Sequence, residues 1–98
     1  MLNERFTLSN GVTIPKIGYG TWMIEDSKAA EAVKSAIEVG YRHIDTAQAY
    51  QNEHGVGEGI RSSGIDRQEL FITTKLAAEI KNYAEAVDAI NASLDRLG

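Results

Sequence analysis

The feature that most constrains this chain is the alternation of short apolar segments with longer segments of helical periodicity. After a predicted β-hairpin over residues 6–14, a strand-like and a helix-like segment alternate three times, over about 17–39, 41–63 and 70–97. Units of about 25–30 residues are typical of βα repeats. Such repeats form a parallel sheet, so the sequence predicts an α/β fold whose strands end at one common edge.

Turn and capping residues support these boundaries. Asn10 and Gly11 are predicted to supply the positive φ angles of a tight primed turn in the hairpin. Asp26 or Ser27 is predicted to cap the first helix, and Gly40 to stop it. The second helix is rich in glycine, so we expect it to depend on close packing.

The last helix has the clearest pattern. Asn82 and Glu85 form a capping-box pattern at its start. Its apolar residues recur at spacings of four and three: Tyr83, Val87, Ile90, Leu94 and Leu97. Helices on one side leave the other face of a parallel sheet uncovered, whereas such sheets are normally buried on both faces. We therefore expect more chain, or a partner, to cover the exposed surface.

Composition excludes several classes of function. The net charge of −4, without a basic run, argues against binding to nucleic acid or to an anionic membrane surface. The absence of cysteine excludes disulfides, thiolate catalysis and thiolate metal sites. No apolar run approaches the roughly 20 residues of a membrane span, and the N-terminus lacks the layout of a signal peptide. Cytoplasm is the expected location.

Charged residues end two of the predicted strands. Asp45 follows one apolar strand and Lys75 ends the next. Neighbouring strands lie ~4.8 Å apart, so these two side chains can form an ion pair. Tyr50 lies on the intervening loop, where a nearby ammonium would stabilise its phenolate and make it a candidate general acid. A purely structural salt bridge at the rim of the sheet is the alternative interpretation.

Two other patterns suggest different sites. Residues 18–23 follow a strand and precede a helix, as in the dinucleotide fingerprint, but Met23 stands where the third glycine belongs. A Rossmann-type site is therefore the less favoured alternative. His43 with Glu53 or His54 could suggest a metal site, but no tight ligand motif is present, so none is predicted. We expect His43 to be a hydrogen-bonded interior histidine.

Several spaced motifs together resemble the N-terminal signature of the aldo-keto reductases. They are GYRHIDTA at residues 40–47, IGYGTW at 17–22 and FITTKL at 71–76, with Tyr50, Asn52, Glu53, Val56 and Gly57. The bacterial branch of 2,5-diketogluconate and glyoxal reductases is the most similar. The resemblance implies the N-terminal portion of a TIM (β/α)8 barrel, with a β-hairpin and three βα units. It also implies NADPH-dependent reduction of an aldehyde or ketone to an alcohol.

The resemblance implies a role for each charged or phenolic residue. Tyr50 would protonate the carbonyl oxygen as hydride arrives from the nicotinamide. Lys75 would promote ionisation of Tyr50, and Asp45 would hold Lys75 while lying near the nicotinamide ribose. The cofactor would supply the hydride, and the protein would orient the cofactor and substrate and provide the electrostatic environment.

The same resemblance implies the lining of the cleft. Gly20, Thr21 and Trp22 would line the nicotinamide and substrate end, with Trp22 and Tyr50 in contact with the carbonyl substrate. Without the resemblance, Trp22 could equally form a wall of a substrate pocket or cap the end of the sheet. The family often has tryptophan two positions after the lysine that corresponds to Lys75, where this chain has Ala77. The resemblance therefore does not predict an aromatic wall of the pocket at this position.

The length of the chain adds a further expectation. A barrel of this type typically needs ~250 residues, and the family's catalytic histidine and most of its cofactor-binding strands lie beyond residue 98. We expect a fragment that alone binds NADPH weakly or not at all and turns over no substrate. Its uncovered sheet edges should drive self-association or pairing with the remainder of the barrel. The alternative is a non-enzymatic, self-associating module.

Overall fold

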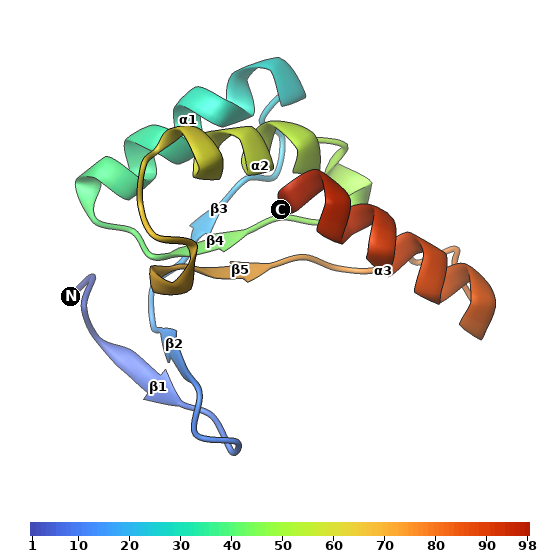
Figure 1. Cartoon of the computed structure of the whole chain (residues 1–98), viewed down its shortest axis with the longest axis horizontal. Helices are drawn as coiled ribbons and strands as arrows, with labels where there is room; N and C mark the ends of the chain where they lie inside the picture. The colour runs from blue at the N-terminus through green and yellow to red at the C-terminus, as the bar shows by residue number, and fades with distance from the viewer.

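The computed structural model describes residues 1–98 and contains a hairpin, a parallel sheet and three α-helices (Figure 1). In chain order the elements are β1 (Arg5–Thr7), β2 (Thr13–Pro15), β3 (Tyr19–Gly20), α1 (Asp26–Val39), β4 (His43–Asp45), the 3₁₀ turn η1 (Gln48–Tyr50), α2 (Glu53–Ser62), the 3₁₀ turn η2 (Arg67–Glu69), β5 (Phe71–Thr73) and α3 (Tyr83–Leu97). The expected hairpin followed by three strand–helix units is confirmed.

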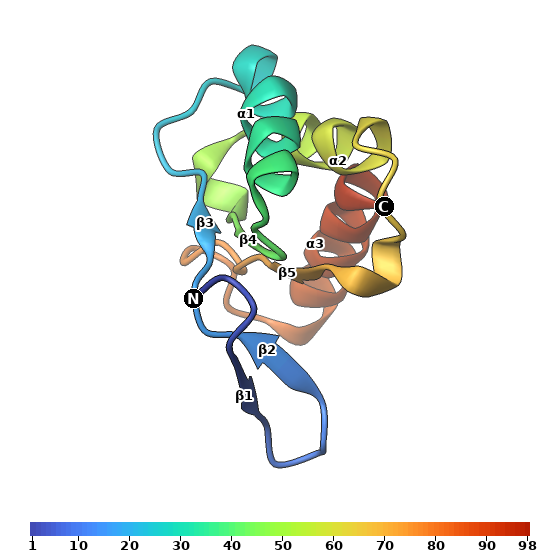
Figure 2. The same cartoon turned by 90° about the vertical axis from the view of Figure 1, so that its left-hand side faces the viewer.

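The strands form two separate sheets. β1 and β2 pair antiparallel and project away from the helices (Figure 2). The other sheet has the order β3-β4-β5, with both pairs parallel. Its register sets Gly20 beside Asp45 and Asp45 beside Thr73, so the three strands end together. This common edge is where the polar strand ends meet.

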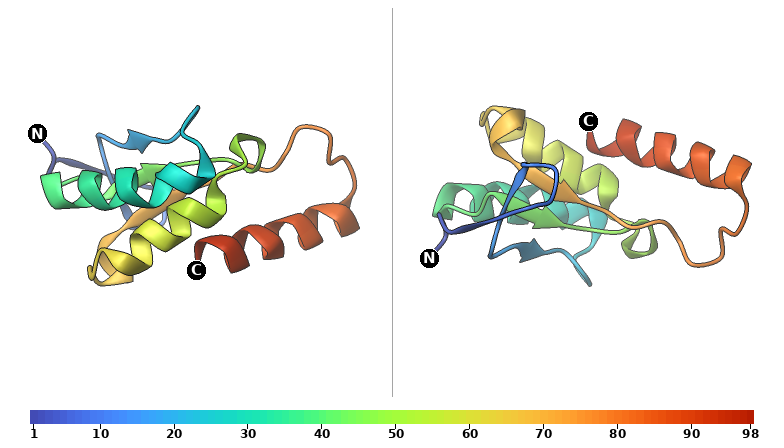
Figure 3. Two further views of the ribbon diagram at one scale, coloured as in Figure 1. Left: turned by 90° about the horizontal axis from the view of Figure 1, so that it is seen from above. Right: turned by 90° about the horizontal axis from the view of Figure 1, so that it is seen from below.

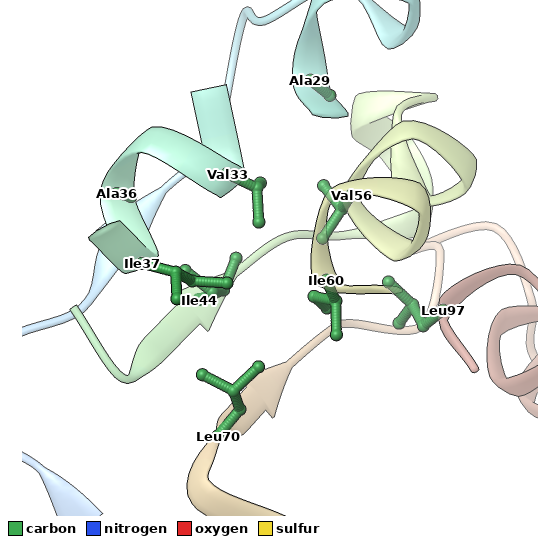
Figure 4. Packing of buried hydrophobic residues seen from close by; sticks show 9 residues of the cluster. All are labelled: Ala29, Val33, Ala36, Ile37, Ile44, Val56, Ile60, Leu70 and Leu97. Carbon is green, nitrogen blue, oxygen red and sulfur yellow. The ribbon is translucent and has the colours of Figure 1, made fainter. Parts of the chain in front are cut away.

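The hydrophobic core lies between the parallel sheet and the pair α1 and α2. Successive side chains of a strand point to opposite faces, so Ile44 faces the helices while His43 and Asp45 face away from them. Ile44 is fully buried, and in Figure 4 Val33 of α1 lies above it and Ile37 of α1 beside it. The whole cluster comprises Ala29, Val33, Ala36, Ile37, Ile44, Val56, Ile60, Leu70 and Leu97. No helix covers the other sheet face (Figure 1).

The glycines of α2 allow it to pack closely on both sides, as expected. Seen from above, α1, α2 and α3 lie in that order (Figure 3). A methyl group on Gly55 would collide with the carbonyl oxygen of Asp26 in α1, and one on Gly57 with the carbonyl oxygen of Arg96 in α3. On Gly59, it would lie 2.7 Å from a carbonyl oxygen of α1. The absence of a side chain at these three positions therefore lets α2 pack closely against α1 and α3.

The hairpin turn differs from the expectation of a two-residue primed turn. Only Gly11 has a positive φ, +86°, whereas Asn10 does not. Leu8 N donates to Val12 O at 2.8 Å, and the Asn10 side chain accepts from Val12 N at 3.0 Å. The backbone of Asn10 is therefore not left-handed. Its side-chain oxygen instead accepts the hydrogen bond of Val12 N within a loop longer than two residues.

The predicted cap of α1 by Asp26 or Ser27 is wrong. The N-cap residue is Glu25, which makes no side-chain cap bond. Asp26 Oδ1 instead accepts from the backbone N of Gly55 in the first turn of α2, at 2.7 Å. Asp26 therefore satisfies a free amide of the neighbouring helix, a tertiary contact that local pattern does not reveal.

The last helix begins as predicted, but its apolar face is mostly exposed. Asn82 Oδ1 accepts from Glu85 N at 2.9 Å. Along the apolar stripe only Leu97 is buried, and Leu94 is 60% exposed. The reason is that α3 packs on another helix only near its own C-terminal end, where Arg96 and Leu97 lie against Gly57 of α2. None of the helices has the length and apolarity needed to cross a bilayer.

Candidate active site

Asp45 and Lys75 form the ion pair expected at the ends of β4 and β5. Lys75 Nζ lies 2.8 Å from Asp45 Oδ2 and 3.0 Å from Oδ1. The same ammonium donates to the carbonyl oxygen of Thr46 at 2.9 Å. The parallel register, which sets Asp45 beside Thr73, carries Lys75 just past the strand end and over the carboxylate.

Tyr50 lies against the same ammonium. It ends η1, and Lys75 Nζ is 5.2 Å from the centroid of its ring. The next residue, Gln51, has a φ of 56°, a left-handed conformation that residues other than glycine seldom adopt. Such backbone conformations cluster at functional sites. The structure therefore brings Asp45, Tyr50 and Lys75 together at one edge of the sheet.

The electrostatic environment keeps Lys75 charged. Partial burial on its own lowers the pKa of Lys75, but the hydrogen bond and the negative charge of Asp45, with a smaller contribution from Tyr50, outweigh it. The net effect raises the pKa of the ammonium above its ordinary value. A fixed positive charge therefore lies beside the Tyr50 ring at neutral pH.

Besides Asp45, three residues are predicted to line a cofactor, and they lie around the end of β3. Gly20 is exposed, with no atom within 4 Å of where a Cβ would be. Thr21 is fully buried, and its hydroxyl and backbone N each donate to Asp45 O at 3.0 Å. Trp22 is 71% exposed. Thr21 thus fixes the backbone of Asp45, and the cofactor contacts of all three residues stay a prediction.

Asn52 organises the loops beneath this site, a role that the sequence did not reveal. It is fully buried. Its Nδ2 donates to Thr21 O at 2.8 Å and to Ile24 O at 3.0 Å, and its Oδ1 accepts from Thr46 Oγ1 at 2.8 Å. Asn52 therefore joins the loop after β3 to the loop after β4. Asn52 is the N-cap residue of α2, but its side chain makes no cap bond.

Glu53 is the centre of a buried polar network, a role that the residue pattern does not predict. Its side chain is 2% exposed. Oε1 accepts from Arg96 Nη2 at 2.6 Å, from Arg96 Nε at 2.8 Å and from Ser93 Oγ at 3.1 Å. Oε2 accepts from Thr74 Oγ1 at 2.5 Å. Glu53 thus ties α2 to α3 and to the residue before Lys75.

Neither histidine is hydrogen-bonded to Glu53, whose partners are Thr74, Ser93 and Arg96. His43 Nε2 is 2.8 Å from Thr73 Oγ1, so the expected hydrogen bond is present, but the side chain is half-buried on the uncovered sheet face and not in the interior. A Cβ on Gly18 would lie 3.0 Å from His43 Nδ1, so this glycine of the dinucleotide-like pattern makes room for a side chain. His54 Nδ1 lies 3.5 Å from Asp26 Oδ2 at the helix ends.

Two partly open hollows border the network. One, of about 340 Å³, lies beside Lys75 and is lined by Gln48, Thr74, Lys75, Leu76, Ile90, Ser93, Leu94 and Leu97. The other, of about 380 Å³, is lined only by polar residues: Asp26, Gln48, Gln51, Glu53, His54 and Arg96. Gln48 lies at the boundary of both.

Comparison with known proteins gives consistent matches over the chain. The model of the aldo/keto reductase family matches residues 16–98. Glyoxal reductase of Bacillus subtilis is 47% identical over 97 residues, which cover 98% of this chain and 35% of that protein. The chain spans about a third of the length of the curated relatives it matches.

Solved structures show the same arrangement of elements. An aldo/keto reductase from Brucella melitensis superposes with a TM-score of 0.92 at 45% identity, covering 97% of this chain and 37% of that one. An aldo-keto reductase of Bombyx mori, solved in complex with NADP, superposes with a TM-score of 0.87 at 39% identity, covering 100% of this chain and 35% of that one.

Proposed function

The chain belongs to the aldo-keto reductase family, and we propose from this that it supplies the proton-donating part of an NADPH-dependent carbonyl reductase site. Its hairpin and three βα units correspond to the N-terminal portion of a (β/α)8 barrel. The observation that supports the proposal best is the convergence of Asp45, Tyr50 and Lys75 at the strand ends, where barrel enzymes carry their active sites.

The proposed reaction divides the work between the cofactor and these side chains. NADPH, when bound, supplies a hydride to the carbonyl carbon. The Tyr50 hydroxyl donates its proton to the carbonyl oxygen, which completes the alcohol. The Lys75 ammonium stabilises the phenolate left behind, and Asp45 holds the ammonium in place. The substrate is an aldehyde or a ketone.

The residues at the end of β3 fit the nicotinamide end of this cofactor. Gly20 leaves open space beside Asp45, its neighbour in the sheet register. Trp22 offers an exposed ring from the same loop. We propose that Gly20, Thr21, Trp22 and Asp45 border the nicotinamide and its ribose. Trp22 and Tyr50 border the substrate. Thr21 acts there through its backbone and through Asp45, since its side chain is buried.

A graft tests the proposal. Residues 1–98 joined to the remaining part of Bacillus subtilis glyoxal reductase should oxidise NADPH when glyoxal is added, because the graft places the three side chains in a complete barrel. Loss of NADPH absorbance measures the reaction, with glyoxal reductase itself as the positive control. The 98-residue chain alone is the matched comparison, and we expect it to bind NADPH weakly or not at all and to turn over no substrate. A folded graft that binds NADPH but does not react would contradict the proposal.

A second candidate is a non-enzymatic module that associates with itself. The observation that favours it is the exposed apolar stripe of α3, in which Ile90 is 50% exposed and Tyr83 is 85% exposed. The outer edges of β3 and β5 are also unpaired within the chain. Light scattering across a range of concentrations discriminates between the candidates. The second candidate is supported only if the 98-residue chain forms an oligomer of defined size and the graft is inactive.

A further inference from the structure

We propose that Gln48 is a positioning residue that sets the distance between Tyr50 and Lys75. The importance of this distance rests on the proposed function, in which the ammonium acts on the phenol. The distance itself is a property of the fold. Gln48 is half-buried at the start of the 3₁₀ turn that ends at Tyr50, so it belongs to the segment that carries the phenol.

Gln48 bonds directly to the segment that carries the ammonium, on both sides of Leu76. Its backbone N donates to Lys75 O at 3.2 Å. Its side-chain Oε1 accepts from Ala77 N at 2.8 Å. One residue therefore fixes the backbone of Lys75 and of Ala77 relative to the turn that holds Tyr50.

The amide of Gln48 is itself fixed by α3. Its Nε2 donates to Ala89 O at 3.0 Å and to Ser93 Oγ at 2.9 Å. The Ser93 hydroxyl in turn donates to Glu53 Oε1 at 3.1 Å. The oxygen and both hydrogens of the amide thus have partners, and this side chain has one orientation that satisfies all of them.

A second anchor lies immediately before Lys75. Thr74 Oγ1 donates to Glu53 Oε2, so the buried carboxylate fixes the residue on the other side of the lysine. The Lys75 side chain is 48% exposed, so packing alone does not determine its position. Hydrogen bonds to Gln48 and Glu53, joined through Ser93, hold the backbone on both sides of it.

Nuclear magnetic resonance of the 98-residue chain tests this role through the contact between the Lys75 side chain and the Tyr50 ring. In the parent we expect cross-peaks between the Lys75 methylene protons and the ring protons. Gln48→Met keeps the length of the side chain but cannot form the three amide bonds, so these cross-peaks should weaken strongly. The matched control is Gln68→Met, an exposed glutamine outside the network, which should change nothing.

A kinetic measurement in the graft provides the second readout. A misplacement of about 1 Å can cost about 10²-fold in rate, so Gln48→Met should lower kcat by roughly that factor and leave the KM for NADPH unchanged. If Gln48→Met does not fold, Ser93→Ala removes one partner of the amide and should weaken the same cross-peaks partially. Unchanged cross-peaks in the folded variant, or in Ser93→Ala, overturn the proposal. An inactive parent graft whose cross-peaks depend on Gln48 contradicts the proposed function alone.

Discussion

Replacing Tyr50 with phenylalanine in the graft should reduce NADPH-dependent turnover by about 10²- to 10⁴-fold, the usual contribution of a general acid. The substitution removes only the hydroxyl that would protonate the carbonyl oxygen. The ring stays, and so does its packing against the Lys75 ammonium 5.2 Å away. NADPH affinity should therefore remain unchanged. Steady-state kinetics measures kcat, and quenching of NADPH fluorescence measures binding.

A second tyrosine provides the matched control for this substitution. Tyr41 packs edge-on against Tyr19, with ring centroids 5.5 Å apart, on the helix side of the sheet. Tyr41→Phe removes a hydroxyl of the same chemistry far from the proposed proton transfer, so turnover should stay close to that of the parent. If Tyr50→Phe retained parental kcat, the proton would have to come from another group.

Replacing Gly57 with alanine should destabilise the fold by about 3 kcal/mol, the upper part of the usual range for overpacking. Alanine in a helix interior normally gains about 1 kcal/mol over glycine. Here the added methyl group would overlap the carbonyl oxygen of Arg96 and lie 3.0 Å from Leu97 Cα. Backbone atoms cannot rotate out of the way as a side chain can, so α2 and α3 would have to separate.

Urea denaturation measures this loss as a lower midpoint with an unchanged slope. Glu58→Ala is the matched control, because it places the same residue on the exposed side of α2 and should leave the midpoint nearly unchanged. Equal stability of Gly57→Ala and the parent would show that the two helices do not pack as closely as the structure indicates.

The arrangement of the strand ends could be predicted because it depends on short-range regularities. Apolar segments of strand length end in Asp45 and in Lys75, and parallel strands with helical crossovers must end at the same edge. The separation of neighbouring strands then brings the two charges within reach. The presence and capping of α3 could be predicted for the same reason, since Asn82 bonds to an amide three residues away.

The residues that support the site could not be predicted in this way. Glu53 and Arg96 are 43 residues apart in the sequence, and only the docking of α3 on α2 brings them together. Asp26 lies where a local cap belongs, yet it bonds to a helix 29 residues away. The exposure of Leu94 depends on what packs against α3, which its periodicity does not encode.

The dependence of the free energy of unfolding on pH reports on the pair formed by Lys75 and Asp45. Because the pKa of Lys75 is raised in the folded chain, its contribution to stability is complete below the ordinary pKa of 10.5. That contribution is lost as the pH rises through the folded value, when the ammonium loses its proton and the pair with Asp45 disappears.

The most direct test of the central claim, that Asp45 and Lys75 form one charged pair beside Tyr50, is the pKa of Lys75 followed by nuclear magnetic resonance of its side chain. We expect the pKa of Lys75 to lie above its ordinary value of 10.5 in the parent. In Asp45→Asn the pKa should fall, because the hydrogen-bonded negative charge is lost while the opposing effect of burial remains. A Lys75 that titrates at its ordinary value in the parent and does not respond to Asp45→Asn would contradict the claim.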